Sequence, residues 1–65
     1  MRVKKVNDWL YLTAYGLYDR PKLVVLKGAP PEQVQFARDV DDSGLLAGVI
    51  FEADLSRPEE MLERL

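Results

Sequence analysis

Cysteine and histidine are both missing from this 65-residue sequence. Without cysteine there is no disulfide and no thiolate ligand for a metal ion, and without histidine the commonest metal ligand and general base is also lost. Nucleophilic catalysis by a Ser-His or Cys-His pair is therefore excluded. We expect a protein that is not an enzyme and that uses no cofactor.

Long apolar runs and phosphate-binding loops are also missing. The longest apolar run, Trp9 to Leu17, is about half of the ~20 residues that a membrane helix requires. The basic start of the chain leads into Asn7-Asp8 and not into the apolar core of a signal peptide. Pro30 and Pro31 remove the backbone amides with which a loop at Gly28 would hold phosphate. We expect a cytoplasmic protein with no membrane contact, and the sequence indicates no small-molecule substrate.

Uncharged polar side chains are scarce, and this scarcity has a possible environmental cause. Proteins of thermophiles often replace Asn, Gln and Cys by charged residues and proline. The sequence therefore permits the hypothesis of a thermophilic source.

The residues that are present are those of a folded domain, with 48% hydrophobic and 31% charged side chains. A chain of this length buries only about 60% of the surface that its unfolded form exposes. With no disulfide available, close packing and self-association are the remaining ways to stabilise it. We predict one domain, 1–65, that is β-rich over 1–27, forms a βαβ unit over 22–53 and ends in a helix over 57–65.

The second half of the chain carries the clearest signals. The runs 22–27 and 45–51 are apolar on both alternating faces, which is typical of central strands. Between them, Pro30 and Pro31 suit the first turn of a helix and Gly44 suits its end. A strand, a helix and a strand in this order predict two parallel strands. The predicted helix places Phe36, Ala37 and Val40 on one side, with Val34 at its edge.

After the second strand, Ser56 and Glu59 have the spacing of a capping box at the start of a helix. Met61, Leu62 and Leu65 form the apolar stripe of that helix. Ser56 comes directly before the predicted helix 57–65, and the other four residues lie within it.

The first half of the chain reads as β-rich. Residues 2–6 suit a short edge strand, Asn7-Asp8 a turn and residues 9–18 a second strand. Aromatic side chains favour this strand, although Asp8 could also cap a ten-residue helix. We predict an α+β fold, a two-layer sandwich in βββαβα order, with a mixed sheet and two helices on one face.

An uncovered sheet face would form the partner-binding surface. Two short helices on one face leave nothing to cover the other, and strand alternation places aromatic side chains there. The predicted partner-binding residues are Trp9, Tyr11, Tyr15 and Leu17. We expect a homodimer or the binding of another protein, as an adaptor or inhibitor would; in the simpler alternative these aromatic residues belong to the core.

Charge suggests a second function. Residues 1–28 carry a net charge of +4 and residues 29–65 a net charge of −6. Basic residues near aromatic ones are typical of single-stranded nucleic-acid binding, here Arg2, Lys4 and Lys22 beside the aromatic face. The chain as a whole is acidic, whereas most nucleic-acid-binding proteins are basic, so nucleic-acid binding is kept as the alternative function.

Carboxylates suggest a third function, which is the binding of a cation. Asp39, Asp41 and Ser43 match the opening of a calcium loop, but Ile50 stands where its final Glu ligand is needed. We therefore expect no metal site and keep cation binding as a weak alternative. Glu52 and Asp54, at the end of a strand, form a conceivable acid/base pair but suit ordinary surface residues better.

Overall fold

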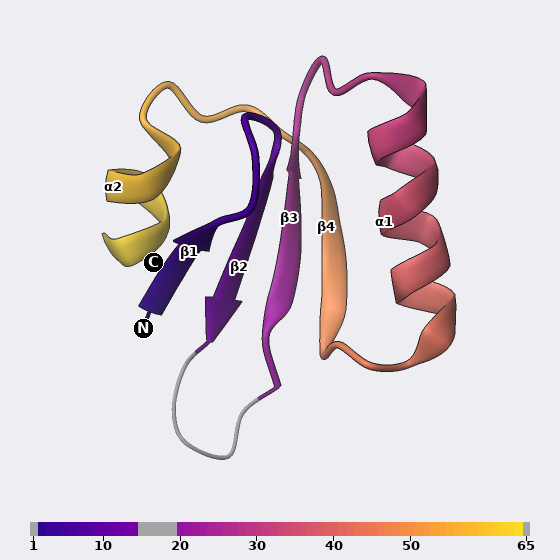
Figure 1. The fold of residues 1–65 in the computed structure, drawn as a ribbon. Coiled ribbons are helices and arrows are strands. Elements are labelled where there is room, and N and C mark those ends of the chain that lie inside the picture. The colour runs from indigo at the N-terminus through magenta and orange to yellow at the C-terminus, as the bar shows by residue number, and fades with distance from the viewer. Residues whose placement is uncertain (1, 15–19, 65) are drawn as a thin grey trace.

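The computed structural model describes residues 2–14 and 20–64. These residues form a four-stranded sheet in the order β1-β2-β3-β4 and two helices (Figure 1). The elements are β1 Arg2–Lys5, β2 Leu10–Ala14, β3 Lys22–Leu26, α1 Pro31–Ser43, β4 Gly48–Ala53 and α2 Pro58–Arg64.

The pairing of the strands confirms the mixed sheet. β1 pairs antiparallel with β2, β2 pairs antiparallel with β3, and β3 pairs parallel with β4. The parallel pair is joined by α1, as the apolar runs on either side of a proline-led helix predict. The α+β class and the βββαβα order are confirmed.

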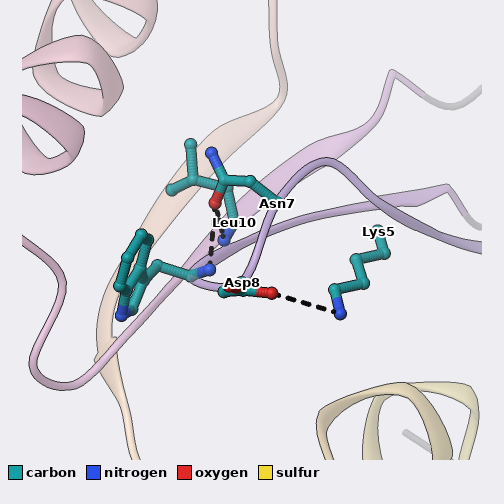
Figure 2. Close-up of polar contacts among 5 residues, drawn as sticks. Lys5, Asn7, Asp8 and Leu10 are labelled. Carbon is teal, nitrogen blue, oxygen red and sulfur yellow. Dashed lines mark hydrogen bonds and ion pairs between the residues drawn. The ribbon is translucent and has the colours of Figure 1, made fainter.

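The turn between β1 and β2 is built on one side chain. The Oδ1 atom of Asn7 accepts hydrogen bonds from the amides of Trp9 at 2.9 Å and Leu10 at 3.0 Å (Figure 2). An asparagine that bonds the backbone two residues ahead replaces the hydrogen bond of a backbone turn. The predicted turn is therefore confirmed, and residues 10–14 are a strand and not a helix; residues 15–18 lie outside the described part.

Helix α1 begins and ends where the sequence predicts. Pro31 is its first residue, and Gly44 follows its last residue with a φ of 72°, a left-handed conformation that suits glycine. Ala37 is fully buried, and Val34 and Val40 are half-buried. Phe36, expected on the buried side, is 51% exposed.

The two helices cover opposite faces of the sheet. Ala37 of α1 is buried with Leu10, Leu23 and Val25. Leu62 of α2 is buried with two side chains from the other face, Tyr11 and Val24. The prediction of two helices on one face of a two-layer sandwich is therefore wrong.

The physical reason is the amount of apolar surface on each face. Successive residues of a strand point to opposite faces, so the continuously apolar β3 needs cover on both. Residues 54–57 connect β4 to α2 and bring that helix beside β1, as Figure 1 shows. One helix for each face buries side chains from both.

Strand β4 is an edge strand, which corrects the prediction of a central one. Among the strands of residues 2–14 and 20–64, β4 lies at the end of the sheet beside β3, whose other side is occupied by β2. Ile50 is 48% exposed and Phe51 is 38% exposed. The apolar run of β4 therefore has an open edge instead of a second strand.

Candidate protein-interaction surface

One residue of the predicted aromatic surface, Tyr11, is part of the core. Tyr11 is 4% exposed and packs with Leu62, because α2 covers the face that was expected to be open. Trp9 is half-buried and lies in the turn before β2, where its carbonyl accepts a hydrogen bond from the Leu26 amide at 2.8 Å. Tyr15 and Leu17 lie outside the described residues.

The basic residues of the nucleic-acid alternative do not share one face. Arg2 and Lys4 are paired with Ala14 and Leu12, on the face that α1 covers elsewhere. Lys22 is paired with Thr13, whose side chain alternates with that of Leu12 and therefore lies on the other face. A platform that combines these three cations on one side of the sheet is not formed.

The residues of the calcium alternative lie in a helix. Asp39, Asp41 and Ser43 all belong to α1, so they do not converge as ligands in a loop do. Asp39 accepts a hydrogen bond from Gln35 at 2.9 Å, and the Ser43 hydroxyl donates to the Val40 carbonyl. In residues 2–14 and 20–64, no three acidic side chains are grouped in a way that could hold a metal ion.

Glu52 lies in a distorted part of β4. Its φ is 57°, a left-handed value that is uncommon for a residue with a side chain, and the register between β3 and β4 shifts at this point. Glu52 and Asp54 are both exposed. The irregularity is a β-bulge that ends the regular part of the strand after Phe51.

The two edges of the sheet differ in their protection. On β1, Arg2, Lys4 and Lys5 are exposed. Charged side chains on an edge strand, lysine above all, oppose the addition of another strand. The regular part of β4, Gly48–Phe51, carries no charge.

The backbone of β4 also has free hydrogen-bonding groups. The Ala47 amide donates to the Pro21 carbonyl at 2.9 Å, so residue 47 points its amide toward β3. Alternation along the strand then directs the N–H and C=O groups of Gly48 and Ile50 outward. This unpaired edge, Gly48–Phe51, is the candidate site, and we call it the β4 edge.

A groove beside the β4 edge adds polar groups to this surface. It encloses about 320 Å³ between α1, the end of β3 and the bulge. Val34 and Phe51 supply apolar walls, and Arg38 and Glu52 supply a charge of each sign. A strand bound along β4 would have this groove next to it.

Sequence reasoning missed Ile50 and Phe51 as candidate site residues. Both belong to a run that is apolar at every position, and such a run is typical of a strand buried on both sides. The absence of any basic residue between Arg38 and Arg57 gives no signal either, because an unprotected edge strand and a central strand both lack lysine.

No helix among the described residues is long and apolar enough to cross a membrane. Comparison with known proteins gives no match to a family model, to a curated protein or to a solved structure. The surface described above is therefore the basis for a functional proposal.

Proposed function

We propose that this chain is a non-catalytic interaction protein that binds another protein chain by adding a strand to the β4 edge. The observation that carries the proposal is the exposure of Ile50 and Phe51 on an edge strand without a protecting charge. In this binding mode the backbone hydrogen bonds give affinity, and pockets for alternate side chains give specificity.

A protein partner fits the β4 edge better than a nucleic acid does. Nucleic-acid affinity depends on neutralising phosphates with Lys and Arg, and the β4 edge has neither. An extended peptide needs what this edge offers, which is unpaired amides and carbonyls with apolar side chains on both sides. Binding to single-stranded nucleic acid, through Arg2 and Lys4 on the far edge, remains the alternative.

A capture experiment with matched variants tests the proposal. The tagged wild-type chain, Ile50→Lys and Phe36→Lys are expressed in the native host, and the proteins bound to each are identified. Phe36 is the control because it is also an exposed apolar residue, at 51% against 48%, but lies on α1. We expect a specific partner, either another host protein or an untagged copy of the chain itself, to be retained by Phe36→Lys and lost with Ile50→Lys.

Two other results would count against the proposal. A partner that binds Ile50→Lys as well as the wild type would contradict strand addition at β4. Salt-dependent binding of a single-stranded oligonucleotide by the wild-type chain, and loss of that binding in Lys4→Glu, would favour the nucleic-acid alternative.

We also propose a cytoplasmic location and a thermophilic source. The lack of cysteine and the scarcity of asparagine and glutamine support both. A thermal unfolding midpoint below about 60 °C would contradict the thermophilic source, since mesophilic domains melt at about 45–65 °C.

A further inference from the structure

We infer that the strand added to the β4 edge is the β4 of a second copy, paired antiparallel about a two-fold axis at Ile50. This inference rests on the proposed function and names its partner. It would join two four-stranded sheets into one continuous sheet. The arrangement is isologous, so it closes at two copies and leaves no unpaired β4.

The faces of β4 restrict the register. Val49 packs with the cluster beneath α1, whereas Ile50 is paired with Val24 and lies on the other face. Residues directly opposite each other in an antiparallel pair must share a face. A two-fold axis at Ile50 meets this condition, because Ile50 then faces Ile50 of the second copy and Val49 faces Phe51.

This register also matches the side chains best. It places the exposed Ile50 opposite Ile50 of the second copy, and the β-branched Val49 opposite the aromatic Phe51. Cross-strand pairs of this kind stabilise sheets by about 0.2–1 kcal/mol each. A shift of the axis by one residue would place Ile50 opposite either Gly48 or the bulged Glu52. Both shifts lose the pair of exposed Ile50 side chains.

The backbone groups fit the same axis. The N–H and C=O of Ile50 point away from β3, as the Ala47 hydrogen bond to Pro21 indicates. Two such residues facing each other exchange both hydrogen bonds, as directly opposite residues do in alternate pairs of an antiparallel ladder. Pairing would therefore satisfy the unpaired groups at the centre of the β4 edge.

Charge favours pairing through β4 over pairing through β1. In the proposed register Glu52 faces Gly48 of the second copy, so no two like charges are directly opposed. Two β1 strands would bring Arg2, Lys4 and Lys5 of one copy close to those of the other. Like charges that face each other across a pair of strands are destabilising.

A single introduced cysteine tests the register. The chain has no cysteine of its own, so Ile50→Cys carries the only thiol. Directly opposite residues of such a pair have Cα atoms about 4.5–5.5 Å apart, a separation that a disulfide spans. Leu45→Cys is the control at an exposed position just outside β4, since Leu45 is 74% exposed, and Lys4→Cys is the control on the other edge.

Under mild oxidation we expect Ile50→Cys to form a disulfide-linked dimer about tenfold faster than either control, because pairing raises the effective concentration of the thiol. Equal rates for the three variants would overturn the self-pairing. Retention of a different host protein by wild type but not by Ile50→Lys would then leave strand addition standing with another partner. Circular dichroism of each variant confirms that it is folded before oxidation.

Discussion

Asn7 is the side chain on which the first hairpin depends. Its oxygen accepts two backbone hydrogen bonds, and its nitrogen donates to Gln33 of α1 at 3.0 Å. The turn is thereby tied both to β2 and to the helix above it. The sequence identifies Asn7-Asp8 as a turn, but it does not reveal the contact with Gln33, because that contact depends on where α1 packs.

Replacement of Asn7 by alanine should lower the free energy of unfolding by about 1–2 kcal/mol, since two backbone amides lose their acceptor. Chemical denaturation of the variant measures this loss. Asp8→Ala is the control, because it removes only the exposed ion pair with Lys5 and should cost less than about 0.5 kcal/mol. Equal losses in the two variants would contradict the role of Asn7.

Glu52 stores strain at the bulge. A left-handed backbone costs a residue with a side chain about 1–2 kcal/mol, and glycine avoids that cost while it loses more entropy on folding. Glu52→Gly should therefore raise the free energy of unfolding by about 0.5 kcal/mol. Denaturant titration of Glu52→Gly beside Gly44→Ala checks the sign: Gly44 has a φ of 72°, so its replacement should destabilise the protein.

At the scale of the elements, two similar sequence patterns have different positions in the sheet. The apolar runs that become β3 and β4 predict the same buried strand, and the structure places only β3 in the centre. Sequence alone cannot separate them, because the difference is the presence of a neighbour on the far side. The burial of Tyr11 has a related reason, since the path of residues 54–57 decides which face α2 covers.

Helix α2 is the element that keeps Tyr11 out of water. Leu62→Ala removes its buried anchor above Tyr11 and should lower the free energy of unfolding by about 2–4 kcal/mol. Met61→Ala is the matched control, because Met61 is 41% exposed and its loss should cost less than about 1 kcal/mol. A near-neutral Leu62→Ala in denaturant titrations would mean that α2 does not pack as described.

At the scale of the whole molecule, pairing of two copies through β4 would cover the open edge of the sheet and add stability to a domain with a small core. A domain of this length without disulfides has little stability to spare, and pairing two folded chains stabilises both by mass action. The midpoint of thermal unfolding should therefore rise by a few degrees, about 2–5 °C, for each tenfold increase in concentration of the wild-type chain. Scanning calorimetry of Ile50→Lys should show no such rise.

The central claim is that the β4 edges of two copies pair with each other, and sedimentation equilibrium tests it most directly. A short strand pair with few contacts should dimerise with a dissociation constant of about 10 µM. We predict dimers for the wild type and for Phe36→Lys and monomers for Ile50→Lys. A wild-type chain that stays monomeric up to about 1 mM, or an Ile50→Lys variant that dimerises as tightly, would contradict pairing through this edge.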